Sequence, residues 1–223
     1  MRLAARLTDV AVTTFTAGPA SVRAVLPPDV EPVVVDVDGA GAFGLVSAVS
    51  FVLDRVNLWP RLRCGHVDYR AYVRHGDETA VWFLGAAMDS RLAHVLKHGF
   101  GMPWHRARVD VSATGDGYRL NVQRDGADAT IVAVPDGPVT DELAATLVDP
   151  VVGLFEHRGR LRRYEVRHRP LRPEGARANG ARVELFERLR LIHPDQRPYS
   201  ILRIPDFEID IAFPPRRVRA PRR

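Results

Sequence analysis

One segment of the chain holds most of the side chains that could do chemistry. Residues 65–111 read GHVDYRAYVRHGDETAVWFLGAAMDSRLAHVLKHGFGMPWHRARVDV, with acids, arginines, histidines and tryptophans close together. Residues 66–74 alternate strictly between two kinds of side chain, which is typical of a β-strand. Side chains on such a strand point alternately to two faces. One face would carry His66, Asp68, Arg70, Tyr72 and Arg74, and the other Val67, Tyr69, Ala71 and Val73.

The first of these faces is too polar for an ordinary protein core. It faces either solvent, with ion pairs to neighbouring strands, or a polar cavity that binds a ligand. In a cavity, Asp68 would transfer protons, Arg70 would bind a carboxylate or an enolate, and Tyr72 would form part of the wall. The next predicted strand adds Trp82 as a further candidate for substrate binding.

A second group of candidate residues follows a proline-containing turn at residues 101–106, GMPWHR. Trp104, His105 and Arg106 stand where a strand would begin, which is a common place for pocket residues. His105 could act as a general acid or base near neutral pH, and Trp104 and Arg106 could contact the substrate. In the alternative interpretation, Trp104 belongs to the core and His105 to the surface.

Other kinds of chemistry have little support in the sequence. His94 and His98 have the spacing of a metal-binding pair, but no glutamate follows His94 as the HExxH zinc motif requires. A cysteine nucleophile needs a base beside it in space, and the position of Cys64 two residues before His66 on a strand does not provide one. The sequence contains no glycine-rich phosphate loop, nucleophile elbow or dinucleotide fingerprint. We therefore predict neither a metal nor a cofactor.

The elements that would position these residues are predicted to be mostly strands, because short β-type stretches alternate with turn signals. The predicted strands are 33–38, 43–53, 66–74, 80–88, 106–112, 118–124, 130–134, 152–157, 162–168, 182–191 and 199–213, the last broken at Pro205. Short helices are predicted at 21–25, 91–98 and 140–148. Many strands joined by tight turns favour a closed or sandwiched antiparallel sheet.

Length and charge indicate one domain with a short tail. The 223 residues, 46% of them hydrophobic, are enough to bury a sizeable core. We assign residues 1–213 to one domain and 214–223 to a basic tail that lacks apolar periodicity and is predicted to be disordered. The tail holds five arginines, which account for the whole net charge of +5. Because residues 1–213 are nearly neutral overall, we do not expect nucleic-acid binding to be the main function.

Several features predict a cytoplasmic protein. The single Cys64 suits a reducing compartment, and Arg6 and Asp9 interrupt any signal-peptide pattern. The longest apolar run, residues 40–53, is too short to cross a bilayer, so we predict no membrane partner. A small-molecule substrate is the partner that we expect, and assembly into a homo-oligomer stays open.

The order and spacing of several segments also resemble a known family. These segments are SVRAVLPPDVEP, AFGLVSAVSF, DYRAYVRHG, VWFLGAAMDS, FGMPWHRARV, RLRRYEVRHRPLRP and PYSILRIPDFEIDIAFPPRRV. Over most of its length the chain resembles the YqjF-like family of uncharacterised proteins, a branch of the acetoacetate-decarboxylase-like superfamily. The resemblance implies a mainly β fold with a few short helices: a cone-like antiparallel β-barrel or sandwich with a central cavity.

The resemblance also implies a site in which one key group is missing. Acetoacetate decarboxylases form a Schiff base with a lysine just after a Gly-x-Pro turn, and a second lysine beside it lowers its pKa. Residues 101–103 are similar to that turn, but Trp104 and His105 stand at the two lysine positions. The only lysine in the sequence, Lys97, precedes the turn. Asp68 falls where these decarboxylases place a glutamate in the cavity.

We therefore expect a small-molecule enzyme of lyase or isomerase type that acts on a keto acid or a polyketide-like carbonyl compound. Its acid–base chemistry, without a Schiff-base lysine, would be enolisation, dehydration, cyclisation or decarboxylation, with Asp68 and His105 transferring protons. An alternative is a protein that binds a small metabolite without changing it. A third hypothesis, nucleic-acid binding through the tail, predicts salt-dependent binding that disappears when residues 216–223 are deleted.

Overall fold

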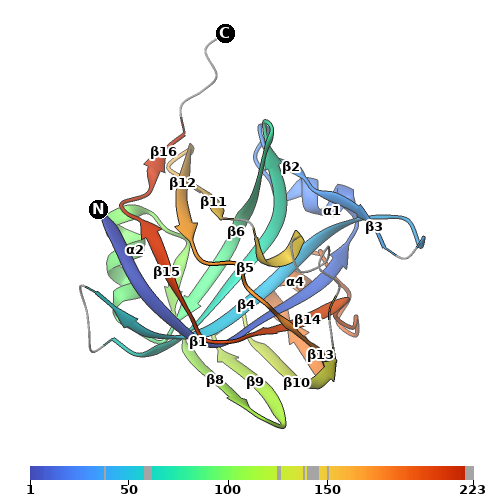
Figure 1. The fold of residues 1–223 in the computed structure, drawn as a ribbon. Coiled ribbons are helices and arrows are strands. Elements are labelled where there is room, and N and C mark those ends of the chain that lie inside the picture. The colour runs from blue at the N-terminus through green and yellow to red at the C-terminus, as the bar shows by residue number, and fades with distance from the viewer. Residues whose placement is uncertain are drawn as a thin grey trace.

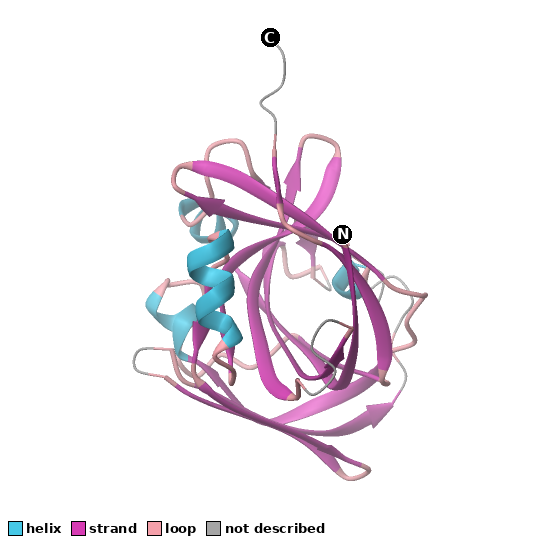
Figure 2. Cartoon of the chain, turned by 90° about the vertical axis from the view of Figure 1, so that its left-hand side faces the viewer, coloured by secondary structure: helices cyan, strands magenta, loops and turns pink. Residues whose placement is uncertain are grey.

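Seven strands close into a barrel (Figures 1 and 2). The structure is a computed structural model that describes residues 1–37, 39–57, 62–124, 127–137, 139, 146–149 and 151–218. The barrel strands, in spatial order, are β1 (Arg2–Ala17), β4 (Ala42–Val56), β5 (Cys64–His75), β6 (Glu78–Met88), β11 (Val152–His157), β12 (Arg160–Arg167) and β15 (Phe207–Ala212). The neighbours are antiparallel except β6 and β11, and the barrel closes because β1 pairs with both β4 and β15. The predicted mainly β, barrel-type fold is confirmed.

A second layer of strands covers one side of the barrel. From β1 the sheet continues through β14 (Ser200–Ile204), β13 (Glu174–Val183), β10 (Ala129–Gly137) and β9 (Gly117–Gln123) to β8 (Arg108–Thr114). β8 crosses the barrel wall closely at Gly65 of β5, where an added Cβ would lie 2.0 Å from the carbonyl oxygen of Val109. Any larger residue at Gly65 would force the two layers apart, so this glycine sets their contact.

Smaller elements complete the structure. They are α1 (Pro19–Ala24), β2 (Glu31–Pro32), β3 (Val34–Asp36), α2 (Leu92–Phe100), β7 (Trp104–Arg106), α4 (Glu184–Arg188) and β16 (Arg216–Arg217). β7 pairs with β6, and α2 lies against the side of the barrel that faces the viewer in Figure 2. None of the helices in the described ranges is both long and apolar enough to cross a membrane.

The alternation along β5 divides the protein into two buried regions. Val67, Tyr69 and Ala71 belong to the core between the barrel wall and the outer strands. The polar residues of β5 point the other way, into the barrel, where the surrounding core includes Phe51 and Met88. The polar face is divided between the two alternatives: His66, Asp68 and Arg70 line the cavity, whereas Arg74 at the end of the strand is exposed and pairs with Glu31.

Some elements differ from those predicted. β1 was not predicted, and β13 begins at Glu174 in the stretch EGARANGARV, whose glycines and alanines give little strand signal. The strand predicted at 182–191 is wrong after Val183, because residues 184–188 are good helix formers and make α4. The helix predicted at 140–148 lies mostly outside the described residues, which include only its last turn.

The predicted basic tail also begins later than expected. Arg216 and Arg217 form β16, which pairs with Arg163 and Arg162 of β12. The amide of Val218 donates a hydrogen bond to the carbonyl of Leu161 at 3.1 Å. Residues 214–218 are therefore part of the folded domain, and the predicted disorder from residue 214 is wrong for this stretch.

Candidate functional site

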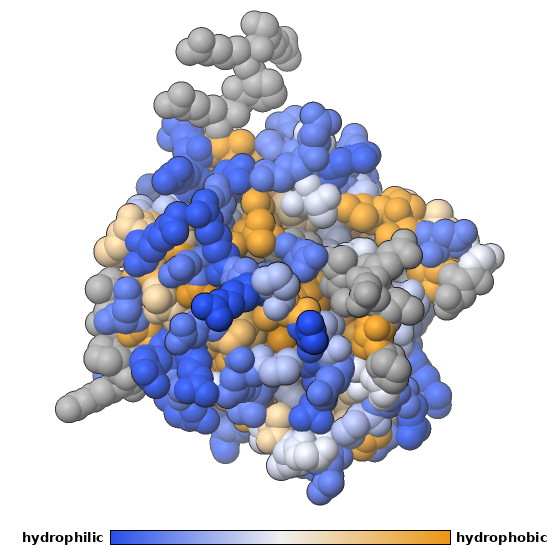
Figure 3. All heavy atoms as spheres, viewed as in Figure 1, coloured by the Kyte–Doolittle hydropathy of each residue, from blue (hydrophilic) through white to orange (hydrophobic). Residues whose placement is uncertain are grey.

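A cavity of about 430 Å³ lies inside the barrel. This volume is within the range of small-molecule sites in proteins. Its described walls are apolar or aromatic, apart from four residues with ionisable polar heads: His66, Asp68, Arg70 and His168. The protein face seen in Figure 3 is mostly hydrophilic, with hydrophobic side chains visible in patches between the polar ones. The cavity is therefore an apolar compartment, and three of its four ionisable residues lie on β5.

The register of the barrel strands places three of these polar residues side by side. His66 lies opposite Phe51 of β4 and Met88 of β6, and Asp68 lies opposite Val49 and Ala86. A β-bulge interrupts the pairing between β5 and β6 just before Arg70. Because all three side chains point inward from β5, the charged groups line a single wall of the cavity.

His66 and Asp68 form a hydrogen-bonded pair. The distance between His66 Nε2 and Asp68 Oδ1 is 2.8 Å. The His66 ring stacks on Phe51 with centroids 4.6 Å apart, and Trp104 contacts it edge-on at 5.2 Å. Within this pair Nε2 of His66 donates the hydrogen bond and the carboxylate oxygen of Asp68 accepts it. The imidazole is almost fully buried, whereas the Asp68 side chain is 15% exposed, so the carboxylate is the more accessible member of the pair.

Arg70 is held from behind by a buried network. Its Nη2 donates hydrogen bonds to the carbonyl of Leu147 at 2.8 Å and to the Tyr72 hydroxyl at 3.1 Å. Tyr72 donates to the same carbonyl at 2.9 Å and accepts from Ser47 at 3.1 Å. Within the described residues, no carboxylate lies within ion-pair distance of Arg70, and its Nε has no partner. The guanidinium therefore carries an unneutralised positive charge that suits an anionic ligand.

Tyr164 of β12 adds a phenol to the cavity wall. Burial raises its pKa well above the ordinary value, and the charge of Asp68 raises it further while Arg70 opposes this. The phenol therefore stays protonated and able to donate a hydrogen bond. The sequence analysis missed Tyr164, although its place in the alternating strand predicted at 162–168 put it on the same face as Val166, which also lines the cavity.

Gly153 makes room for the Tyr164 ring. An added Cβ would lie 2.7 Å from Cε1 of Tyr164 and 2.6 Å from Cε2 of Phe83, closer than real Cβ contacts. The Phe83 and Tyr164 rings themselves pack with centroids 5.4 Å apart. Gly153 on β11 therefore allows two aromatic rings from the strands on either side to meet over it.

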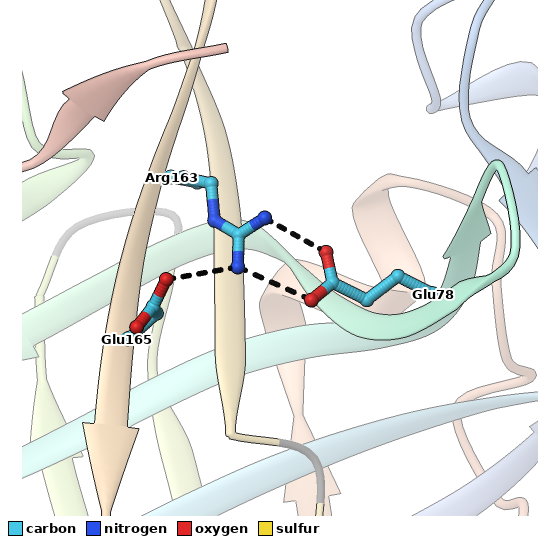
Figure 4. A network of polar contacts seen from close by, with 3 residues as sticks. All are labelled: Glu78, Arg163 and Glu165. Carbon is cyan, nitrogen blue, oxygen red and sulfur yellow. Dashed lines mark hydrogen bonds and ion pairs between the residues drawn. The ribbon is translucent and has the colours of Figure 1, made fainter.

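An ion-pair network fixes the outside of the same strand (Figure 4). Arg163 donates to both carboxylate oxygens of Glu78 on β6, at 2.9 and 3.1 Å, and to Glu165 at 3.0 Å. All three side chains are partly exposed, so each pair contributes only about 0–1 kcal/mol. The geometry nevertheless ties β12 to β6 across β11 and so orients Tyr164 on the inner face.

The structure brings some of the predicted site residues together. Asp68, Arg70 and Trp104 line the cavity. Tyr72 is fully buried behind Arg70 and does not line the cavity itself, so it supports the arginine rather than forming a wall. The Nε1 donor of Trp104 is buried without a partner in the described structure, which leaves it free for a ligand or a water molecule.

Three predicted site residues lie elsewhere. Trp82 points into the core outside the barrel, because its neighbours Val81 and Phe83 take the inward positions of β6. Arg106 is exposed at the end of β7. His105 lies opposite Ala87, on the other face of β7 from Trp104, and is not among the described residues of the cavity wall. The hydrogen-bond partner of Asp68 is His66 and not His105, and a catalytic role for His105 stays a prediction.

His105 instead pairs with the only lysine. Lys97 Nζ lies 3.1 Å from His105 Nδ1. Burial, together with the charges of Arg124 and Lys97, lowers the pKa of His105 to about 4. His105 is therefore neutral at physiological pH, and its Nδ1 accepts the hydrogen bond from the lysine ammonium. Like His105, Lys97 is not among the described cavity-lining residues.

The described residues show no group of three or more histidines, cysteines, aspartates and glutamates placed to hold a metal ion. The rings of His94 and His98 on α2 contact each other, with centroids 4.1 Å apart. Cys64 is buried, and burial together with the charge of Asp89 raises its pKa to about 11, which keeps the thiol protonated.

Comparison with known proteins agrees with the barrel. Residues 4–203 match DUF2071, a family described as an uncharacterized conserved protein. No curated protein matches the sequence. Acetoacetate decarboxylase from Legionella pneumophila is 12% identical and superimposes with a TM-score of 0.67, over 96% of this chain and 87% of that one. An acetoacetate decarboxylase-like enzyme from Sphingomonas wittichii is 10% identical, with a TM-score of 0.67 over 97% and 92% of the two chains.

A third solved structure is the enduracididine biosynthesis enzyme MppR, determined with HEPES bound. It is 11% identical and has a TM-score of 0.63 over 97% of this chain and 86% of that one. At these identities the likeness establishes a shared fold, and the chemistry has to be argued from the residues in the cavity.

Proposed function

The chain belongs to the DUF2071 family, and we propose that it is a small-molecule enzyme that performs acid–base chemistry on a carbonyl compound without a Schiff-base lysine. One observation carries the proposal: a histidine–aspartate pair and an arginine without a carboxylate partner share one wall of an otherwise apolar cavity. Charged groups are costly in apolar surroundings and concentrate at functional sites. Solved enzymes with this barrel, including an acetoacetate decarboxylase, support a role in small-molecule chemistry.

In the proposed reaction, Asp68 removes a proton from the carbon next to the substrate carbonyl. The proton moves to the carboxylate, and the electron pair of the C–H bond forms an enolate whose charge rests on oxygen. His66 acts as a positioning residue, because it donates a hydrogen bond to Asp68 and its ring is held between Phe51 and Trp104. The apolar walls of the site strengthen each of these electrostatic interactions.

Donors near the carboxylate would stabilise the enolate. The protonated Tyr164 and the unpartnered Nε1 of Trp104 both belong to residues that line the cavity. Arg70 would bind a carboxylate of the substrate, and Leu147 and Tyr72 hold its guanidinium in place. Whether the enolate is reprotonated, or goes on to dehydration, cyclisation or decarboxylation, depends on the leaving group that the substrate carries.

The position of Lys97 supports a mechanism without an imine. A Schiff base needs an unprotonated amine beside the substrate carbonyl. Lys97 is the only lysine in the sequence, and its Nζ lies 3.1 Å from His105 Nδ1 and not among the described cavity-lining residues.

Deuterium exchange tests the proposal. The protein is incubated in D₂O with pyruvate, 2-oxobutanoate and 2-oxooctanoate, and NMR follows the loss of the protons next to the carbonyl. We expect protein-dependent exchange that Asp68→Asn lowers by about a hundredfold or more, the usual contribution of a general base. Lys97→Gln is the matched control and should exchange like the wild type. Wild-type exchange in Asp68→Asn, or its loss in Lys97→Gln alone, would overturn the proposal.

The second candidate function, a metabolite-binding protein without catalysis, has a different outcome in the same experiment. The apolar lining and the enclosed volume would serve retention of a ligand as well as its conversion. Saturable binding of an oxo acid with no exchange above background would identify this function instead.

A further inference from the structure

We propose that the ligand is an amphiphilic oxo acid: a carboxylate and a carbonyl at one end, and an apolar tail of about six to ten carbons. The inference rests on the proposed function for the carbonyl group, whereas the carboxylate and the tail follow from the cavity itself. Such a ligand is longer and more hydrophobic than acetoacetate or pyruvate.

The volume of the cavity sets the size of the ligand. A liquid water molecule takes about 30 Å³, so a cavity of about 430 Å³ holds about 14 groups of that size. A four-carbon oxo acid would fill about half of this space and leave apolar walls against water or void. The carboxylate and carbonyl account for about five groups, which leaves about nine for the tail.

The distribution of polarity sets the shape of the ligand. Asp68 and Arg70 share one strand, so the charged end of a ligand is expected to bind there. Most of the remaining wall is aliphatic or aromatic, including Leu7 and Ile209 from the barrel and Leu96 and Phe100 from α2. A polar group placed against this apolar part of the wall would lose its hydration without gaining a hydrogen bond.

The helix α2 gives the tail its apolar cover. Its residues Leu92, Val95, Leu96 and Phe100 recur with helical spacing and all line the cavity. Val95 is nevertheless 56% exposed, so the cavity reaches the surface along this helix. Phe100 packs against Phe213 near the end of the chain, with centroids 4.5 Å apart. A hydrophobic tail could pass beneath α2 and cover surface that is now partly open to solvent.

Arg70 supplies the argument for a carboxylate. Its guanidinium faces the cavity with no carboxylate partner among the described residues, while two neutral oxygens hold it in place. Charge-assisted hydrogen bonds between arginine and a carboxylate are stronger and more directional than neutral ones. A ligand carboxylate would neutralise the charge that the protein leaves unpaired.

Saturated carboxylates test the tail and the carboxylate without any turnover. We would measure the Kd of butanoate, octanoate, decanoate, dodecanoate and tetradecanoate by calorimetry on the intact protein. Each buried methylene should lower the Kd about fourfold until the cavity is full, near about twelve carbons, after which the Kd should level off. A Kd that does not change with chain length would overturn the inference.

Two variants locate the two ends of the ligand. Ala5 lines the cavity from β1, so Ala5→Leu should move the point of levelling about three carbons shorter. Ala4, its exposed neighbour, provides the control Ala4→Leu, which should leave the series unchanged. Arg70→Gln should weaken octanoate binding about tenfold or more and leave octanol unaffected. Equal shifts in both alanine variants, or equal losses for octanoate and octanol, would contradict the proposed orientation.

The outcomes separate this inference from the proposed function. Carboxylate binding that depends on chain length, without deuterium exchange, would support the proposed ligand class and contradict the proposed enzymatic function. Exchange that is equally fast for pyruvate and 2-oxooctanoate, together with a flat binding series, would keep the enzyme and remove the ligand class.

Discussion

Replacing Gly153 by alanine should damage the cavity wall at one defined point. The new Cβ would lie 2.6 Å from Phe83 and 2.7 Å from Tyr164, and neither ring can rotate away easily because each packs against the other. Overpacking of this kind costs about 1–3 kcal/mol. For a domain of this length, each kcal/mol lowers the Tm by about 2–4 °C. We therefore expect Gly153→Ala to lower the Tm by about 2–12 °C.

The same substitution should also affect ligand binding. Tyr164 is one of the two rings that the new Cβ would press against, and the charges of Asp68 and Arg70 act on its phenol. A shift of the phenol would change the polar end of the cavity, so octanoate should bind more weakly to Gly153→Ala than to the wild type. Urea unfolding and calorimetry measure the two effects on the same preparation.

Gly180→Ala is the matched control. Gly180 also lies in a strand, β13, but an added Cβ there meets no atom within 4 Å. Its unfolding free energy should stay within about 0.5 kcal/mol of the wild-type value. If Gly153→Ala and Gly180→Ala unfold at the same urea concentration and bind octanoate equally, the packing of the two rings over Gly153 is refuted.

Three further predictions follow from buried groups. The pKa of His105 is lowered from 6.5 to about 4 in the native state. As the pH falls from 6.5 to 4, the unfolded chain therefore binds a proton at this residue and the native protein does not. Stability should therefore drop by about 1 kcal/mol between pH 6.5 and 4, after screening at this partly exposed site, and His105→Gln should flatten that slope in urea titrations. The pKa of Cys64 is about 11 in the native protein, against an ordinary value of 9.0. At equal pH, iodoacetamide should therefore modify Cys64 about a hundredfold more slowly in the native than in the unfolded protein. Similar rates in the two states would refute the burial of this thiol. Tyr72→Phe removes a buried hydroxyl bonded to Leu147 and should lower the unfolding free energy by about 1–2 kcal/mol, whereas an unchanged value would show that this network contributes nothing.

The polar face of β5 could be predicted because two signals agreed there. Strict alternation fixed which residues share a face, and the mixture of acid, arginine and aromatic side chains was too polar for a core. Period-two geometry is a local property of the chain, so it needs no knowledge of the partner strands. The shared face of Asp68 and Arg70 therefore followed from residues 66–74, whereas the choice between solvent and cavity needed the structure.

The partners of these residues could not be predicted in the same way. His105 was chosen because histidine titrates near neutral pH, but β7 turns it to the face opposite Trp104. His66 was already on the correct face, two residues before Asp68, and the alternation alone placed it beside the carboxylate. Tyr164 comes from a strand almost a hundred residues away, and only the parallel pairing of β6 and β11 brings its hairpin to the site. Such contacts depend on topology, which local pattern does not contain.

The prediction of the fold also succeeded where the signal was local and failed where it depended on topology. β4, β5 and β6 were predicted because they are rich in valine and aromatic residues or alternate clearly. β13 was assigned to the wrong residues, because its glycine- and alanine-rich sequence is stabilised by pairing with β10 and β14 and not by its own propensity. β16 was assigned to the tail because its two arginines carry no strand signal until β12 pairs with them.

A double-label experiment tests most directly whether the cavity performs acid–base chemistry without an imine. 2-Oxooctanoate is incubated with the protein in D₂O enriched in ¹⁸O, and mass spectrometry counts both labels. Enolisation by Asp68 replaces the protons next to the carbonyl and leaves its oxygen in place, whereas an imine must release that oxygen to water and regain one on hydrolysis. We expect the protein to accelerate deuterium uptake, whereas ¹⁸O should enter the carbonyl only at the rate seen without protein. Matched uptake of both labels, abolished by Lys97→Gln, would contradict this expectation.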